Sequence, residues 1–344
     1  MLDLLRLLLA LLVMVSHLSG QETCEHFGTY AVFGFYIISG YLITAVSRNT
    51  YPLSLPGCGA FILNRFLRIY PSYCLVTALS LCAVLVIGER ATQFNPLLQP
   101  PKTAGEIVGN MLILPVLPTG SIRLIPPSWS LAVELVYYLV LWLFLSRSFA
   151  LALVAVGTGI VYTLGLVLVG ASWYHRYFDL LPSLLPFAIG ACLYFMKERR
   201  LLPHVRSRTF LLSLVLFLLN LGLTMLLPMD QRMAAPFYLN LLIVTFLIAS
   251  ALNVPIKDKR SLRFCRYLGK ISYPLYLVHW LAGLLVGLWV LRSNQPNWTV
   301  FVVTLPVAFG FAGLLVHFVE RPLDLIRGEV KTGLRRSGSV VPVN

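Results

Sequence analysis

Ten apolar segments, each about 20 residues long, constrain this chain more than any other feature of its sequence. A helix of that length crosses a hydrocarbon core about 30 Å thick, whereas a membrane β-barrel needs alternating segments of about ten residues. The chain is 58% hydrophobic and 12% charged, with a mean hydropathy of +0.82, well above the values of soluble domains. We predict an all-α integral membrane protein with ten transmembrane helices, at about residues 2–19, 28–46, 70–88, 127–146, 149–170, 178–196, 209–228, 233–251, 271–291 and 298–319.

The distribution of basic residues predicts how these helices are oriented. An even number of segments places both termini on one side of the membrane, and 20 of the 27 Lys and Arg residues fall on that side. Basic residues concentrate in cytoplasmic loops, so we expect both termini in the cytoplasm. The net charge of +14 is spread over several short loops, as topology signals are, which argues against a nucleic-acid partner.

The organisation of the chain favours one domain. Residues 1–327 are expected to form a single transmembrane domain without internal repeats, and residues 328–344 a disordered cytoplasmic tail. The proline-rich loop from Glu89 to Pro127 predicts a partial cover over the outer mouth, with a short helix near residues 106–114. Six cysteines lie mostly in or beside apolar segments without a C-x-x-C pattern, so neither a disulfide framework nor a metal site is expected.

Two polar residues interrupt the first segment on one helical face. Arg6 and His17 are eleven residues apart, which makes three turns plus roughly 20° and a distance of about 16 Å along the axis. An intramembrane charge is costly, so such residues usually face a bundle interior or a watery cavity. A neutral imidazole can accept a proton from a hydroxyl, and an arginine can hold an anion or polarise a carbonyl. The alternative for the histidine is a structural hydrogen bond.

The fourth segment contains a carboxylate, Glu134, within PPSWSLAVELVYY. An unpaired carboxylate at this depth is expensive, so it requires a partner or water. It either forms a structural ion pair with Arg6 or another cation, or it supports the histidine or binds acceptor hydroxyls. Ser128, Trp129 and Ser130 lie at the membrane edge, where a helix cap and an aromatic anchor are the ordinary roles and contact with the acceptor is the alternative.

Arg65 and Arg68 are i, i+3 neighbours between the second and third segments. They either anchor lipid headgroups and set the topology, or they bind phosphates at the cytoplasmic face, which suits a bulky anionic donor such as coenzyme A. Ser39 and Gly40, in FYIISGYLI, are expected to form a small-residue contact between helices. Close approach of this backbone to a ligand is the alternative.

The last two segments contain further polar residues. Tyr273 and His279, in ISYPLYLVHW, are expected to pack and form hydrogen bonds between helices, with contact to a substrate as the alternative. Glu320 and Arg321 end the tenth segment, where a terminal ion pair followed by a helix stop at Pro322 explains them. The remaining histidines show no spacing typical of a metal site.

These motifs, in this order, resemble the membrane-bound acyltransferase 3 family. The resemblance covers nearly the whole chain, from Arg6-x10-His17 through FYIISGYLI, Arg65-x-x-Arg68, SWSLAVELVYY and ISYPLYLVHW to FVERP. The chain resembles the stand-alone form of this family, without a fused hydrolase-like domain. One departure lies in AVFGFY, where this chain has Phe33 and no carboxylate, although many members have an acidic residue a few positions before the Ser-Gly motif.

The resemblance implies a membrane O-acyltransferase. It implies transfer of an acyl group, most often acetyl, from acyl-coenzyme A to a hydroxyl of a carbohydrate such as a cell-surface polysaccharide or a lipid-linked glycan. Carried over by position, His17 is the catalytic base and Glu134 supports it or the acceptor, while Arg6 contacts the donor or its thioester. The expected donor site consists of Arg6, Arg65, Arg68 and Ser39.

The resemblance also implies partners and a location. Acetyl-coenzyme A is the expected donor substrate, without a metal, and membrane lipids and a carbohydrate acceptor are the expected partners. The oligomeric state is left open, with a homodimer among the options. The expected location is the cytoplasmic (inner) membrane of a bacterium, which the chain crosses several times.

A proton-coupled transporter of a sugar or organic acid is the main alternative function, because intramembrane Arg, His and Glu can form a proton path. A non-catalytic membrane scaffold is the third possible function.

Overall fold

The computed structural model describes residues 1–113, 122–202, 207–254 and 258–336, and these residues form helices and connecting loops without a strand. The prediction of an all-α protein is therefore confirmed for this part of the chain. The longer helices are α1 (Leu2–Leu18), α2 (Glu25–Thr50), α3 (Leu55–Ile87), α6 (Trp129–Val140), α7 (Phe149–Leu168), α9 (Leu184–Glu198), α10 (Ser207–Thr224), α12 (Ala235–Ala251), α13 (Lys259–Leu285), α14 (Trp298–Leu315) and α15 (Arg321–Arg336). The short elements are η1 (Glu22–Cys24), α4 (Glu89–Phe94), α5 (Ala104–Leu112), η2 (Pro126–Ser128), η3 (Leu141–Leu145), α8 (Trp173–Tyr177), η4 (Leu181–Ser183), α11 (Met229–Arg232), η5 (Val286–Val290) and η6 (Val316–Glu320).

Seven helical stretches in the described ranges are long and apolar enough to cross a membrane. They are Glu25–Thr50, Leu55–Ile87, Pro126–Leu145, Phe149–Leu168, Met229–Ala251, Lys259–Val290 and Trp298–Leu334. The other three predicted segments also coincide with helices, α1, α9 and α10, which are shorter. Length and composition thus support a multi-pass membrane protein with seven candidate spans. The count of ten and the cytoplasmic position of both termini stay predictions.

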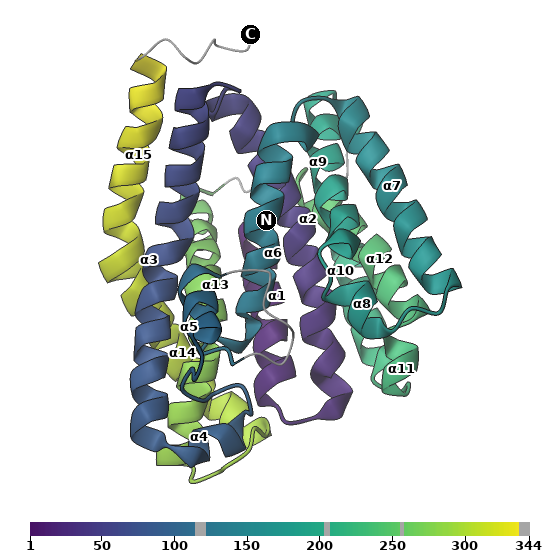
Figure 1. Cartoon of the computed structure of the whole chain (residues 1–344). Coiled ribbons are helices and arrows are strands. Elements are labelled where there is room, and N and C mark those ends of the chain that lie inside the picture. The colour runs from purple at the N-terminus through teal and green to yellow at the C-terminus, as the bar shows by residue number, and fades with distance from the viewer. Residues whose placement is uncertain (114–121, 203–206, 255–257, 337–344) are drawn as a thin grey trace.

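The helices pack around α1 and α13. Helix α1 contacts both α2 and α13, α2 packs on α9, and α13 packs on α14. Figure 1 shows α3 beside α15 on one flank and the α7, α9, α10 and α12 group on the other. In their most apolar windows, α13 is 89% buried and α7 only 17% buried. Polar residues on α1 and α13 can therefore face the bundle interior, whereas α7 is suited to face lipid.

Helices α2 and α9 cross at two glycines. A Cβ atom on Gly40 would overlap the carbonyl oxygen of Phe187, and a Cβ atom on Gly190 would overlap that of Ile37. Neither position has room for a side chain, because the two backbones are in direct contact. Gly40 is thus a packing residue, as expected, and this crossing fixes the position of the neighbouring Ser39.

The long loop before α6 contains a short capped helix. Helix α5 begins after Thr103, whose hydroxyl accepts from the backbone N–H of Glu106, and the Glu106 carboxylate accepts in return from backbone N–H groups of Lys102 and Thr103. These backbone hydrogen bonds lower the pKa of Glu106. The helix lies close to the predicted one. Residues 114–121, with Pro115 and Pro118 of the predicted cover, lie outside the described residues.

The C-terminal region corrects two predictions. A helix stop at Pro322 is wrong, because η6 continues directly into α15, and proline is tolerated in the first turn of a helix. A disordered tail is wrong for residues 328–336, which belong to α15. The helix places Leu323, Ile326, Val330 and Leu334 at helical spacing, so it is amphipathic, and it packs against α3 with Leu334 buried. Residues 337–344 lie outside the described residues.

Candidate active site

A cavity of about 150 Å³ lies inside the bundle between α1, α2, α3, α6 and α13. Apolar side chains form much of its wall, and polar side chains reach it from all five helices. The polar lining consists of Arg6, Tyr36, Ser39, Arg65, Arg68, Ser130, Glu134, Tyr138, Ser272, Tyr273 and Tyr276. Seven of these residues were selected from the sequence, and the fold brings them together although they span more than 260 positions. The selected residues are Arg6, Ser39, Arg65, Arg68, Ser130, Glu134 and Tyr273.

Three arginines give the cavity a positive end. Arg68 donates from Nη1 to Glu320 Oε2 at 2.8 Å, so Glu320 pairs with Arg68 rather than with Arg321 as predicted. The physical reason is that the turn η6 presents Glu320 toward α3, where it is 4% exposed. Within the described part of the chain, neither Arg6 nor Arg65 has an acidic partner within 4 Å. Two cations therefore remain available to an anionic ligand.

Aromatic rings orient the arginines of α3. The guanidinium of Arg65 lies 5.9 Å from the ring centroid of Phe61 and 5.8 Å from that of Tyr138. The guanidinium of Arg68 lies 5.4 Å from the ring of Tyr273, whose hydroxyl donates to the carbonyl oxygen of Ile69. Such contacts hold a cation without neutralising it. Arg65 and Arg68 therefore form part of the cavity wall.

Glu134 faces the cavity from α6 without an ion pair. The hydroxyl of Ser39 donates to its Oε1, and no Lys or Arg nitrogen of the described residues lies within 4 Å of it. Arg6 and Arg65 are near enough to interact with Glu134 electrostatically. The direct ion pair with Arg6 that the sequence left open is thus not formed. Glu134 is a carboxylate in a cationic cavity, available to a ligand hydroxyl.

His17 lies outside the cavity lining and is paired with His279. Nδ1 of His17 lies 2.9 Å from Nε2 of His279, and the two rings are parallel, with centroids 5.2 Å apart. The indole of Trp280 packs on His17 at 5.4 Å. His279 is fully buried, whereas His17 is partly exposed. The hydrogen-bonding partner of His17 is therefore His279, and Glu134 bonds to Ser39 instead.

The contacts of His279 determine which nitrogen of His17 carries a proton. Nδ1 of His279 lies 2.8 Å from the carbonyl oxygen of Tyr276, which can only accept, so this nitrogen carries the hydrogen. In a neutral ring, Nε2 of His279 then accepts from Nδ1–H of His17. Nε2 of His17 is left with a free lone pair. This arrangement makes Nε2 of His17 the basic atom.

Tyr276 links the cavity to the histidine pair. It lines the cavity and lies one helical turn before His279 on α13. Its hydroxyl donates to the carbonyl oxygen of Pro127 at 2.7 Å and contacts Ser130 Oγ at 2.7 Å. The cavity therefore extends from the arginines to within one turn of His279.

Two predicted residues have structural surroundings instead. Ser128 is buried at the start of α6 and does not line the cavity. The indole of Trp129 packs against the rings of Tyr177 and Phe178, with centroids 5.1 and 4.7 Å away. The sequence reasoning missed Tyr36, Tyr138, Ser272 and Tyr276. The spacing of Tyr138 from Glu134 and of Tyr276 from His279 places each on the same helical face as its neighbour.

We compared the sequence with protein families, and the result agrees with the order of the motifs and with the cavity in which they meet. The family model described as an acyltransferase domain matches residues 1–317. The chain belongs to the acyltransferase 3 family. Neither the curated proteins nor the solved structures give a match to it.

Because the chain belongs to this family, the cavity described above lies in a membrane acyltransferase. The family and the seven apolar helices together indicate a multi-pass membrane protein with an acyltransferase domain. No group of three or more His, Cys, Asp or Glu side chains in the described ranges could hold a metal ion. In this acyltransferase the matched region ends within η6, so α15 lies beyond it.

Proposed function

We propose that this protein is a membrane O-acyltransferase that moves an acetyl group from acetyl-coenzyme A to a hydroxyl of a carbohydrate. The observation that carries the proposal is the cavity. Its positive end, with Arg6, Arg65 and Arg68, suits the phosphates of the donor, and its other end reaches Tyr276, one turn from the histidine pair. Family membership favours this enzyme over the transporter that the sequence left open.

The donor enters from the cytoplasmic side in this proposal. Its phosphates bind at Arg65 and Arg6, the two cations without an acidic partner, because guanidinium groups bind phosphate oxygens through paired hydrogen bonds. Arg68, paired with Glu320, borders the same end of the cavity. Arg6 lies about 16 Å along α1 from His17, so we assign it to donor binding rather than to the oxyanion of the reacting carbonyl. The pantetheine arm then extends along the cavity toward Ser130 and Tyr276, and the thioester lies near the histidine pair.

The acceptor hydroxyl is activated by His17. Nε2 of His17 takes the hydroxyl proton while the oxygen attacks the thioester carbonyl. The C–S bond breaks as the tetrahedral intermediate collapses, and the departing thiolate takes the proton back from the imidazolium. His279 accepts from Nδ1–H of His17 throughout, so it fixes the tautomer of the neutral ring and stabilises the imidazolium that forms. The acetyl ester and coenzyme A are the products, and the proposal uses direct transfer in place of an acyl-histidine intermediate.

The proposed function is tested by following the transfer of a labelled acetyl group from the donor. Purified protein in lipid nanodiscs is incubated with acetyl-coenzyme A labelled in the acetyl group and with cell-envelope glycans, lipid-linked oligosaccharides or small glycosides, and transfer is followed by mass spectrometry. We expect label on a glycan hydroxyl, and loss of about 10²- to 10⁴-fold in rate for His17→Ala. Label that remains on coenzyme A with every acceptor contradicts the proposal, as does full activity of folded His17→Ala protein.

A further inference from the structure

Helix α15 lies beyond the matched region but against the donor end of the cavity. It follows η6, which carries Glu320, and packs along α3, the helix of Arg65 and Arg68 (Figure 1). Its side chain Leu334 is buried, and the salt bridge from Asp324 to Lys270 also holds the helix in place. The part of the chain that follows the acyltransferase domain is therefore next to the residues proposed to bind the donor.

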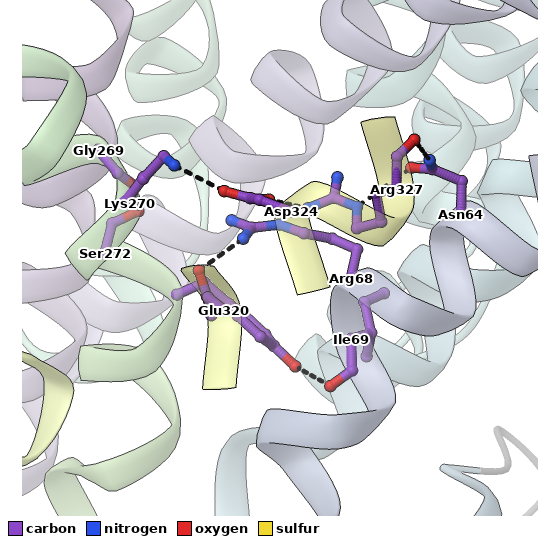
Figure 2. A network of polar contacts seen from close by, with 10 residues as sticks. Asn64, Arg68, Ile69, Gly269, Lys270, Ser272, Glu320, Asp324 and Arg327 are labelled. Carbon is purple, nitrogen blue, oxygen red and sulfur yellow. Dashed lines mark hydrogen bonds and ion pairs between the residues drawn. The ribbon is translucent and has the colours of Figure 1, made fainter. Parts of the chain in front are cut away.

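A buried asparagine joins α15 to Arg65. Asn64 is 0% exposed and uses both atoms of its amide. Its Oδ1 accepts from Arg65 Nη2 at 3.1 Å and from Arg327 Nε at 3.2 Å. Its Nδ2 donates to the carbonyl oxygen of Arg327 at 3.2 Å, and Figure 2 shows this pairing of Asn64 with Arg327. The amide of Asn64 is thus fixed by α15 and holds the Arg65 guanidinium in turn.

Glu320 of η6 and Asp324 of α15 neutralise the neighbouring cations but leave Arg65 without an acidic partner. Asp324 accepts from Arg327 Nη1 at 2.7 Å and from Lys270 Nζ at 2.6 Å, which ties α15 to α13 as well (Figure 2). Glu320 pairs with Arg68. Arg65 has no acidic partner within 4 Å among the described residues, so its orientation depends on Asn64 and on two aromatic rings.

We infer that Asn64 and Arg327 are positioning residues for Arg65, and that α15 is therefore a required part of the donor site. The inference rests on the proposed function, because it takes a phosphate-bearing acyl donor as the ligand of Arg65. A guanidinium held by an uncharged amide keeps its full charge and a fixed direction, so it binds an anion without first breaking an ion pair. Loss of either positioning residue leaves Arg65 charged but oriented only by the two aromatic rings.

Kinetic assays with two acyl donors distinguish the positioning role of Asn64 and Arg327 from a general structural role. Asn64→Ala and Arg327→Ala are each assayed with acetyl-coenzyme A and with S-acetyl-pantetheine, which has the same thioester but no phosphate. We expect KM for acetyl-coenzyme A to rise about tenfold, the effect of losing one charge-assisted hydrogen bond to the donor. KM for the acceptor should not change. With S-acetyl-pantetheine, kcat/KM should equal that of wild type. Arg327→Lys should recover part of the loss, since an ammonium can still donate to Asn64 Oδ1.

Arg321→Ala provides the matched control, because it removes an exposed arginine from the same helix. We expect wild-type kinetics with both donors. Equal losses with both donors for Asn64→Ala and Arg327→Ala would mean a general packing defect and would overturn the inference, as would an unchanged donor KM. If wild-type protein transfers acetyl from neither donor, the proposed function fails and the inference fails with it. Active wild type with unaffected variants rejects the inference alone.

Discussion

His279 accepts a hydrogen bond from His17 across 2.9 Å and donates another to the carbonyl oxygen of Tyr276 across 2.8 Å. The carbonyl can only accept, so the direction of both bonds is fixed. A histidine that must act as a base at neutral pH needs its lone pair on the atom that faces the substrate. Here a second histidine sets that tautomer, in the place where many enzymes use a carboxylate.

Replacement of His279 tests this relationship. His279→Ala removes the acceptor for Nδ1–H of His17, so either ring nitrogen of His17 can carry the hydrogen, and kcat should fall roughly 100-fold. His279→Gln should recover part of this loss, because its amide oxygen can accept the same hydrogen bond. KM for the donor should not change in either variant. Steady-state kinetics and nitrogen NMR of the His17 ring measure both effects.

His175 provides the control for these variants. It is an exposed histidine that pairs with Asp179 at 2.9 Å, remote in sequence from both helices of the pair. His175→Ala should leave kcat unchanged. Wild-type kcat in His279→Ala protein would show that the tautomer is set by something else.

Arg6 and Arg65 are expected to act through donor affinity. Each lacks an acidic partner within 4 Å in the described part of the chain, so its charge is available for the donor phosphates. Arg6→Ala and Arg65→Ala should each raise KM for acetyl-coenzyme A about tenfold while KM for the acceptor stays constant. Arg90→Ala, at an exposed position of the short helix α4, is the control. An equal rise in KM for donor and acceptor contradicts the assignment.

The buried pair of Arg68 and Glu320 is expected to be coupled in stability. The two side chains are 18% and 4% exposed, so removal of one partner leaves a buried charge and costs roughly 3 to 5 kcal/mol of unfolding free energy. The double variant Arg68→Leu with Glu320→Leu should lose less than the two single variants summed. Denaturation in detergent measures the cycle, and strict additivity would argue against the pair.

The crossing of α2 and α9 is expected to tolerate no side chain. Gly40→Ala places a methyl group against the carbonyl of Phe187, so the thermal transition should fall by several degrees or the folded protein should be lost. Gly165→Ala is the matched control, since its Cβ would meet open space, and alanine is favoured over glycine in a helix by about 0.5 to 1 kcal/mol. A stable Gly40→Ala variant would contradict the close crossing.

The sequence determined what depends on local spacing. The apolar segments predicted the helices, because a backbone in lipid must satisfy its own hydrogen bonds. Helical periodicity placed Arg6 on one face with His17, and Arg65 on one face with Arg68. The order of the motifs indicated the family, which the match over residues 1–317 confirms. Seven of the polar residues that line the cavity were selected from the sequence.

Only the tertiary structure decided the partners. His17 and His279 are 262 residues apart, and Arg68 and Glu320 are 252 apart, so no spacing in the sequence relates them. The predicted partner of Glu320, its neighbour Arg321, was wrong, because the helix continues from η6 into α15 and the Glu320 carboxylate lies against Arg68 of α3. A buried polar group bonds to whatever the packing of helices brings within reach, and that packing is set by contacts such as Gly40 on Gly190 that involve the whole bundle.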